Sequence, residues 1–245
     1  MLLAIDIGNT NISAGIFIKG KLKNQFDIAT KTYQAQGLAK RLNRYAEISQ
    51  SVICSVVPRL TEVMRRDLKL ISAKQPYIIG KDLKVPLENR YRLPKQVGQD
   101  RLVNAYAASY LYSCPLIVID SGTAITFDVI SHDQGYLGGL IFPGMNISLE
   151  ALREKTALLP QVKLSSPKML IGRDTKNSIL SGVVFGTAFL SRELVNKIKL
   201  SLGKQAMVIG TGGNIHLIKK YSGIKIKIDT NLTLKGINLV YENKV

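Results

Sequence analysis

The chain has 245 residues, of which 46% are hydrophobic and 21% are charged, so it is long enough to bury a substantial core. This composition excludes a collagen-like chain and a wholly disordered one. Thirty-four Lys and Arg against 17 Asp and Glu give a net charge of +17, which favours anionic ligands such as nucleotides but specifies no fold. Because the basic residues are spread along the whole sequence, we expect a solvated basic surface and regard a nucleic-acid partner as the weaker interpretation.

The cysteines and the apolar stretches bear on the compartment. Two cysteines, Cys54 and Cys114, are too few for a disulfide framework or a four-thiolate zinc site. Apolar stretches such as residues 179–190 are well short of the about 20 residues that a membrane span needs. No basic segment precedes Asp6, so no signal peptide is expected. We therefore predict a cytoplasmic protein without a membrane partner.

Strand-like apolar runs alternate with helix-like amphipathic runs along the chain, which is the pattern of an α/β protein. Pro and Gly interrupt residues 135–170, and this stretch is left unassigned. Residues 175–200 predict one long helix, or two that break near Gly182 or Gly186. The other predicted elements are, in chain order, strands 2–7 and 12–18 around a tight turn at 8–11, strand 51–57, helix 59–71, helix 100–112, strands 116–119 and 125–130, and strand 207–210.

The sequence contains an internal repeat, which appears when residue 6 is laid on residue 120. Residues 4–10 and 118–124 both read apolar-apolar-Asp-x-Gly, followed within two residues by a hydroxyl residue, and each copy then enters a second apolar strand. A third glycine-rich turn, at residues 210–213, follows another apolar run. We infer two duplicated halves that face each other across a cleft.

The residue types in these turns suit phosphate binding. Glycine lets backbone N–H groups approach phosphate oxygens, and a carboxylate can hold Mg²⁺ or water beside them. The repeat therefore predicts a site for a nucleoside triphosphate. The alternative for a single Asp-x-Gly turn is an ordinary hairpin bend without function.

Taken in order, five short motifs resemble the type III pantothenate kinase family, which belongs to the superfamily of acetate and sugar kinases, heat-shock proteins and actin. No Gly-x-x-x-x-Gly-Lys-Ser/Thr sequence is present, which disfavours a P-loop kinase. The resemblance covers residues 2 to about 240. The motifs are Asp6-Ile7-Gly8-Asn9-Thr10, Gly98-Gln99-Asp100-Arg101, Asp120-Ser121-Gly122-Thr123-Ala124, Gly138-Gly139-Leu140-Ile141-Phe142-Pro143-Gly144 and Thr211-Gly212-Gly213.

The resemblance implies an α/β fold of duplicated ribonuclease-H-like halves, as in the actin-like ATPases. Each half would hold a mixed five-stranded sheet with helices, and a cleft would lie between the halves. We expect the N-terminal half to span residues 1–114 and the C-terminal half to span residues 115–245. A homodimer with the pantothenate pocket near the subunit interface is also implied.

The function implied by the resemblance is ATP-dependent phosphorylation of pantothenate to 4'-phosphopantothenate, the first step of coenzyme A biosynthesis. Mg²⁺ would accompany ATP, and a monovalent cation, K⁺ or NH₄⁺, would help to neutralise the phosphates. Asp100 matches the catalytic base, Asp120 the ligand of the monovalent cation, and Asp6 a residue near Mg²⁺. The matched ATP and phosphate residues are Asp6, Ile7, Gly8, Asn9, Thr10, Asn11, Ile12, Ser13 and Thr123, and the matched substrate residues are Tyr91, Gly98, Gln99, Asp100, Arg101 and Thr175.

Alternatives remain open for individual residues and for the whole chain. Asp100 could serve only as the N-cap of the helix that follows. Arg101 could pair with the pantothenate carboxylate, orient Asp100, or lie at the surface. The chain could instead be a DNA-associated accessory factor that keeps the kinase fold, or a related kinase of another small hydroxy acid.

Overall fold

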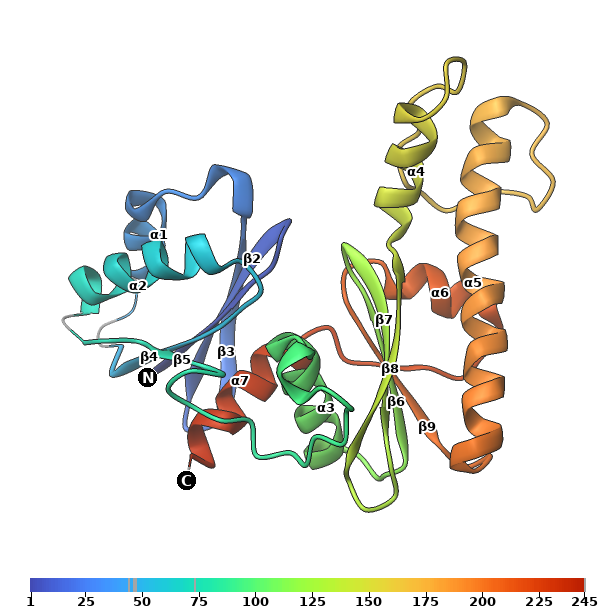
Figure 1. Cartoon of the computed structure of the whole chain (residues 1–245). Coiled ribbons are helices and arrows are strands. Elements are labelled where there is room, and N and C mark those ends of the chain that lie inside the picture. The colour runs from blue at the N-terminus through green and yellow to red at the C-terminus, as the bar shows by residue number, and fades with distance from the viewer. Residues whose placement is uncertain (44, 46–47, 73, 245) are drawn as a thin grey trace. The chain divides into compact units, whose positions relative to one another are not determined.

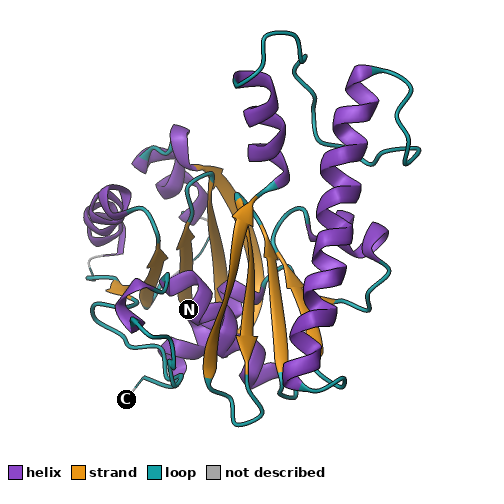
Figure 2. Ribbon diagram, turned by 45° about the vertical axis from the view of Figure 1, so that its right-hand side comes forward, coloured by secondary structure: helices purple, strands orange, loops and turns teal. Residues whose placement is uncertain are grey.

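A computed structural model describes residues 1–43, 45, 48–72 and 74–244. The chain forms two compact units (Figures 1 and 2). The first unit is Met1–Leu111 together with Asn231–Val245, and the second is Tyr112–Thr230. The polypeptide therefore passes from one unit to the other twice.

The first unit contains a five-stranded sheet in the order β3-β2-β1-β4-β5. β1 pairs antiparallel with β2 and parallel with β4, β2 pairs antiparallel with β3, and β4 pairs parallel with β5. Its elements are β1 (Leu2–Ile7), β2 (Asn11–Ile18), β3 (Lys21–Ala29), η1 (Thr30–Thr32), α1 (Ala35–Leu42), β4 (Gln50–Ser55), α2 (Pro58–Ser72), β5 (Tyr77–Ile78), η2 (Pro94–Gln96), α3 (Gln99–Leu111) and α7 (Leu232–Glu242).

The two faces of this sheet are covered by different helices. Ile5 and Ile7 of β1 share one buried cluster with Leu38 of α1 and Met64 of α2. Helix α7 contacts β1, β2 and β4, and its Leu234 lies against Gly15 of β2. Because successive side chains of a strand point to opposite faces, Asp6 lies on the face away from the α1 and α2 core.

The second unit repeats this topology. Its sheet has the order β10-β9-β6-β7-β8, with β7 antiparallel to β6 and β8, and β9 parallel to β6 and β10. Ile117 and Ile119 of β6 share a buried cluster with helices α5 and α6, so Asp120 lies on the opposite face. The elements are β6 (Leu116–Ser121), β7 (Ala124–Ile130), β8 (Tyr136–Pro143), α4 (Met145–Glu154), α5 (Thr175–Leu202), β9 (Met207–Thr211), α6 (Ile215–Ser222) and β10 (Lys227–Ile228).

The identical strand order confirms the duplicated fold that the repeat predicts, and the strands and helices predicted from apolar runs are present. Helix α5 is a single helix, unbroken at Gly182 and Gly186. The strand predicted over residues 51–57 ends at Ser55, because the Ser55 hydroxyl accepts hydrogen bonds from the backbone N–H of Val57 at 3.0 Å and from the Thr61 hydroxyl at 2.7 Å at the start of α2. The sequence analysis did not predict β3, β5, β8, β10, α1, α4, α6 or α7.

The division of the chain differs from the expected one at residue 114. Helix α7 belongs to the first unit rather than to a continuous C-terminal half, because it packs on the first sheet and on α3. A Cβ atom on Gly236 would lie only 2.6 Å from the Val103 carbonyl oxygen, so the two helices are in close contact there. On the side of the second unit, the Tyr112 hydroxyl donates to Asp229 Oδ2 at 2.8 Å, which ties together the two passages of the chain.

Helix α5 is longer and more apolar than the sequence analysis anticipated. Within the described residues it alone has the length and composition of a membrane-spanning helix, with a mean hydropathy of 1.3 over 18 residues. Its Leu180, Val184 and Val195 are buried in the core of the second unit. The apolar character of this helix therefore follows in part from its position on the sheet.

We predict that Gly236→Ala lowers the free energy of unfolding by about 1–3 kcal/mol, because the added methyl group must push α7 away from α3. Gly37→Ala is the matched control, since a Cβ at that exposed position in α1 meets nothing within 4 Å. Its higher helix propensity should raise the stability by up to about 1 kcal/mol. Urea unfolding of both variants measures the difference, and equal effects would contradict the packing argument.

Candidate active site

The turn between β1 and β2 is exposed at the end of the central strand of the first unit. The Gly8 N–H donates to the Asn11 carbonyl at 2.9 Å, and the Ile7 carbonyl accepts from the Val56 N–H at 3.1 Å. The side chains of Asn9, Thr10 and Asn11 are exposed. A short, exposed turn that contains glycine presents its backbone to a ligand, as phosphate binding requires.

Two carboxylates that are far apart in the sequence approach each other beside this turn. Asp6 of β1 lies in register with Cys54 of the parallel strand β4. The Cys54 thiol is fully buried, and its pKa is raised first by that burial and then by the negative charges of Asp6 and Asp100. Both carboxylates therefore lie close to the same sulfur atom, at the end of the sheet where the turn begins.

Asp100 lies at the start of α3 in a desolvated position. Burial raises the pKa of its carboxyl group above the ordinary value, against the opposing effects of the Arg101 N–H, which donates to Oδ1 at 2.9 Å, and of the Arg101 charge. A Cβ atom on Gly98 would lie 2.5 Å from Asp100 Oδ1, so a larger residue there would displace this carboxylate. The position of the Asp100 carboxylate thus depends on the absence of a side chain at Gly98.

The N-cap alternative for Asp100 is wrong. Asp100 is the second residue of α3, and its carboxylate accepts from the adjacent N–H rather than from one two or three residues further on. The Arg101 side chain is buried, and its charge acts on Asp100, so it is not a surface residue. These contacts leave the carboxylate of Asp100 held at one position by its neighbours.

The second unit carries a corresponding turn, at residues 122–123 between β6 and β7. Asp120 is half-buried, the Gly122 N–H donates to the Ala124 carbonyl at 3.0 Å, and Thr123 is exposed. The third glycine-rich turn packs directly on this region, because a Cβ atom on Gly212, whose φ is +84°, would lie 2.4 Å from Asp120 Oδ1. The structure thus brings residues 120–123 and the predicted turn 210–213 together.

The carboxylates beside the turn fit a Mg²⁺ ion that takes most of its ligands from a bound phosphate compound and from water. Among the described residues no three His, Cys, Asp or Glu side chains are grouped as a metal cage. Mg²⁺ in phosphoryl-transfer sites commonly takes one or two protein carboxylates and completes its shell with phosphate oxygens and waters. Asp6, at the end of β1 beside an exposed turn, fits that pattern.

The remaining matched substrate residues belong to different elements of the two units. Tyr91 is half-buried in the first unit, where its backbone N–H donates to Asn89 Oδ1 at 3.0 Å. The Gln99 side chain lies against Gly80. Thr175 belongs to the second unit and is exposed as the first residue of α5, directly after the N-cap Asp174.

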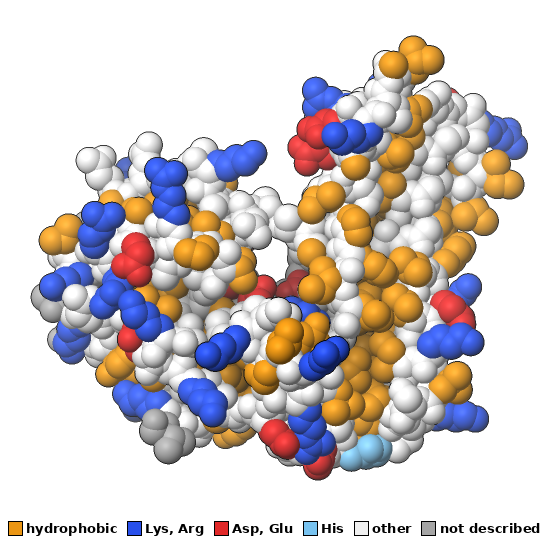
Figure 3. Space-filling model, in the orientation of Figure 1, with side chains coloured by type: hydrophobic (Ala, Val, Ile, Leu, Met, Phe, Trp, Pro, Cys, Tyr) orange, Lys and Arg blue, Asp and Glu red, His pale blue; other side chains and the backbone are white. Residues whose placement is uncertain are grey.

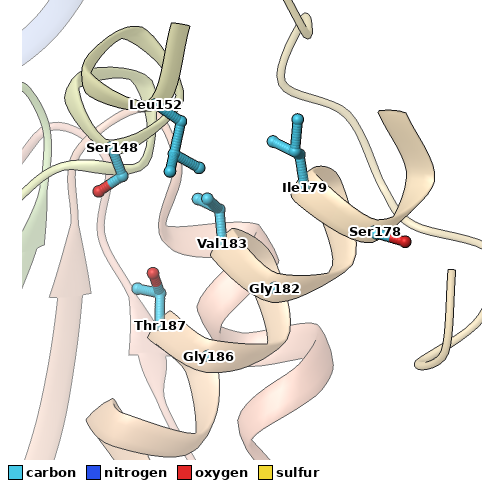
Figure 4. A pocket seen from close by; sticks show the side chains of 8 residues that line it. All are labelled: Ser148, Leu152, Ser178, Ile179, Gly182, Val183, Gly186 and Thr187. Carbon is cyan, nitrogen blue, oxygen red and sulfur yellow. The ribbon is translucent and has the colours of Figure 1, made fainter. Parts of the chain in front are cut away.

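A groove of about 360 Å³ lies between α4 and α5, one turn along from Thr175 (Figure 4). Figure 4 shows the side chains of Leu152 and Val183 between the two helices. Its lining is mostly apolar or small and comprises Ser148, Leu152, Ser178, Ile179, Gly182, Val183, Gly186 and Thr187.

The sequence analysis gave no functional role to three residues around the turns. Cys54 was interpreted only as part of a strand, although register places it beside Asp6. Thr30 directly follows β3, and its backbone N–H donates to the turn of the first unit. Gly144 directly follows β8, and its backbone N–H donates to the turn of the second unit. For Thr30, its position directly after a third strand was the only available signal, whereas Gly144 ends the motif at residues 138–144, and neither β3 nor β8 had been predicted.

Two units with the same mixed sheet define the duplicated ribonuclease-H-like fold of the actin-like ATPases and sugar kinases, and solved structures agree with this class. A 2-dehydro-3-deoxygalactonokinase protein from Sinorhizobium meliloti has a TM-score of 0.59 at 12% identity, with coverage of 99% of this chain and 96% of the other. A protein from Campylobacter jejuni described as a Baf family transcriptional activator has a TM-score of 0.58 at 19% identity, with coverage of 98% and 97%. At these identities the similarity concerns the fold alone.

Sequence relatives are more specific. Residues 2–197 match the family model of type III pantothenate kinase. The type III pantothenate kinase of Moorella thermoacetica is 40% identical, with coverage of 99% of both chains, and that of Finegoldia magna is 38% identical, with coverage of 98% of this chain and 96% of the relative. The chain belongs to the type III pantothenate kinase family.

We predict that Asp100→Asn stabilises the fold while it removes activity. Because burial raises the pKa of Asp100 above the ordinary 3.8, the ionised carboxylate destabilises the folded state at neutral pH. The variant should therefore unfold at higher urea concentration than the wild type at neutral pH. This gain should shrink as the pH falls through the folded-state pKa and vanish below 3.8, where the carboxyl is neutral in both states.

Turnover of the same variant should fall by about 10²- to 10⁴-fold, the usual contribution of a general base. Glu193→Gln is the control, since this exposed carboxylate of α5 only faces Lys197 at 3.8 Å. It should change neither the stability nor the rate appreciably. Full turnover in Asp100→Asn would exclude this residue as the base.

Proposed function

We propose that the chain transfers the γ-phosphoryl group of ATP to pantothenate and so produces 4'-phosphopantothenate, the first step of coenzyme A biosynthesis. Membership of the type III pantothenate kinase family supports this function. The observation that carries it is the convergence of Asp6 and Asp100 on Cys54, beside the exposed turn at residues 8–11. A carboxylate for the metal and a second carboxylate for the acceptor are what phosphoryl transfer to an alcohol needs at one place.

Asp100 is the proposed catalytic base. As the pantothenate hydroxyl oxygen attacks the γ-phosphorus, a new P–O bond forms, the bond from the γ-phosphorus to the leaving ADP oxygen breaks, and Asp100 takes the hydroxyl proton. Its desolvation supports this role, because a carboxylate with a raised pKa is a stronger base. The Arg101 N–H binds the carboxylate in the space that Gly98 leaves, and thereby positions it for the acceptor.

The phosphates of ATP are assigned to the two turns. In the first unit these residues are Asp6, Ile7, Gly8, Asn9, Thr10, Asn11, Ile12 and Ser13. In the second unit the hydroxyl of Thr123 would donate to a phosphate oxygen. Mg²⁺, held by Asp6 and by the phosphates, would supply charge neutralisation for the transferring group.

Asp120 is the proposed ligand of a monovalent cation, K⁺ or NH₄⁺. Its half-buried carboxylate and the glycine turn packed on it support this role, because carboxylate and backbone carbonyl oxygens suit hard cations. Such a cation would offset part of the phosphate charge. The cation would thus do for the second turn what Mg²⁺ does for the first.

Pantothenate is assigned to Gly98, Gln99, Asp100 and Arg101, with further contacts from Tyr91 and Thr175. The guanidinium of Arg101 has two roles open to it, pairing with the pantothenate carboxylate and orienting Asp100. Its buried position and its effect on the pKa of Asp100 support the second role, and a bound carboxylate would compete for the same group.

We expect the purified protein with ATP, Mg²⁺, K⁺ and pantothenate to release ADP and 4'-phosphopantothenate, as a coupled ADP assay with mass spectrometry of the product would measure. Omission of K⁺ should lower the rate, and Asp120→Asn should abolish that cation dependence. A rate without K⁺ equal to the full rate would contradict the role of Asp120. Turnover of a different hydroxy acid but not of pantothenate would favour a related kinase.

The DNA-associated alternative has less support. Lys and Arg side chains are spread over the face seen in Figure 3 rather than gathered in one patch, so the net charge of +17 marks no groove for a nucleic acid on that face. The same preparation should bind DNA only weakly at physiological salt. Tight binding with a steep salt dependence, in a preparation that lacks kinase activity, would reverse the assignment.

A homodimer is the proposed assembly. Figure 3 shows apolar side chains over the part of the second unit that carries β8 and α5. The exposed apolar residues of β8, α4 and α5 include Leu140, Ile141, Ile147 and Leu190. Together with the groove between α4 and α5, they offer an apolar surface for a second copy.

We predict that sedimentation gives the mass of a dimer, and that Gly186→Arg shifts the equilibrium to monomer, because a long charged side chain would enter the α4–α5 groove. Gly37→Ala, in the first unit, should leave the mass unchanged. A wild-type monomer at high protein concentration would contradict the proposed assembly.

A further inference from the structure

In each unit, the residue that directly follows the third strand is hydrogen-bonded to the turn assigned to phosphate. In the first unit this residue is Thr30, whose backbone N–H donates to the Thr10 carbonyl at 2.9 Å. In the second unit it is Gly144, whose N–H donates to the Thr123 carbonyl at 3.0 Å. Both bonds end on the residue that directly precedes the second strand of the unit.

Strand register shows that the two positions are equivalent. Ala29, the last residue of β3, pairs with Asn11, which directly follows Thr10. Pro143, the last residue of β8, pairs with Ala124, which directly follows Thr123. The residue after each third strand is therefore carried by the sheet to the same place beside each turn.

Thr30 makes a second bond to its turn through the side chain. Its Oγ1 donates to the Gly8 carbonyl at 2.8 Å, so one residue binds two carbonyl oxygens of the turn. A carbonyl oxygen that faced a phosphate would repel it, whereas backbone N–H groups attract it. Holding the Gly8 and Thr10 carbonyls on the side of Thr30 thus fixes the orientation of the peptide planes in the turn.

Gly144 binds the turn of the second unit through its backbone alone, because there is no room for a side chain at this position. A Cβ atom at this position would lie 2.2 Å from the Thr123 carbonyl oxygen and 2.6 Å from the Gly122 carbonyl oxygen. Gly144 is also the N-cap of α4, where Ser, Thr, Asp or Asn would otherwise be favoured. The close approach of the turn excludes them. This accounts for the final glycine of the motif at residues 138–144, for which the proposed reaction gave no role.

We propose that Thr30 and Gly144 are positioning residues that hold the carbonyl oxygens of the two phosphate turns away from bound ATP. The inference rests on the proposed function, since it takes these turns to bind the phosphates. We call each of these residues the anchor of its turn. Thr30 binds its turn through a hydroxyl and an N–H, and Gly144 binds its turn through an N–H alone. Loss of an anchor should weaken ATP binding while the pantothenate site keeps its geometry.

The first test compares Thr30→Val, Thr30→Ser and Thr32→Val in the full-length protein. Valine keeps the shape of threonine but loses the bond to Gly8, so KM for ATP should rise about 3- to 10-fold, the usual range for one neutral hydrogen bond. KM for pantothenate should change by less than about 2-fold. Thr30→Ser keeps the hydroxyl and should restore most of the wild-type KM for ATP.

Thr32→Val is the matched control for the first test. Its exposed hydroxyl donates only to the Ala29 carbonyl, at 3.3 Å, and not to the turn. This variant should retain the wild-type KM for both substrates. A Thr30→Val enzyme with unchanged KM for ATP, or a rise in Thr32→Val equal to that in Thr30→Val, would overturn the role of Thr30.

The second test is Gly144→Ala, with Gly37→Ala as control. The added methyl group must displace the Gly122–Thr123 turn, so KM for ATP should rise by about 10-fold or more, whereas Gly37→Ala should behave as the wild type. Titration of each variant with a non-hydrolysable ATP analogue gives the same comparison without turnover. A folded Gly144→Ala protein, as judged by its urea unfolding curve, that binds the analogue as the wild type does would overturn the role of Gly144.

These outcomes separate the two proposals. If the wild type does not phosphorylate pantothenate but binds the ATP analogue, the proposed reaction fails, and weaker binding by Thr30→Val and Gly144→Ala would still support the anchors. If the wild type is active and both variants equal it, the anchors fail and the reaction stands. Lowered kcat with unchanged KM for ATP would show a general loss of active protein and would also contradict the anchors.

Discussion

The alternation of side chains along β1 and β6 is the constraint on which the site depends. Ile5 and Ile7 are held in one core by α1 and α2, and Ile117 and Ile119 in another by α5 and α6. Because side chains alternate, Asp6 and Asp120 must then lie on the opposite face of each sheet, one residue before the strand ends. A slip of one residue in either strand would bury a carboxylate among apolar helices. The register that buries the core therefore also determines where the carboxylates lie.

The surroundings of Asp100 illustrate how a polar site is built against an apolar sheet. Its carboxylate is desolvated, and this burial disfavours ionisation. The Cys54 thiol, on which the charges of Asp6 and Asp100 both act, is fully buried, and its raised pKa keeps it neutral, so it adds no third charge. Arg101 supplies an N–H and a positive charge in compensation, and Gly98 supplies only space. The arrangement keeps Asp100 basic, but the buried carboxylate lowers the stability of the folded state, as is common at functional sites.

Much of the fold could be predicted from the sequence because the central strands are continuous apolar runs and because the repeat pairs residue 6 with residue 120. The family resemblance added the expected role of Asp100, which no periodicity could have supplied. The missed strands have physical reasons. β3 is an edge strand that alternates between exposed and half-exposed residues, and β8 contains adjacent glycines, so neither carries a strong apolar pattern. The roles of Thr30 and Gly144 depend on those strands and on strand register, which the sequence does not display.

The return of α7 to the first sheet has a consequence for biosynthesis. Residues 112–230 form one unbroken stretch, whereas the first unit needs residues from both ends of the polypeptide. On the ribosome, the second unit can therefore finish folding while the first still lacks the helix that covers β1, β2 and β4. Until residues 232–242 emerge, that face of the first sheet exposes apolar surface to the cell, and the nascent chain is then most in need of a chaperone.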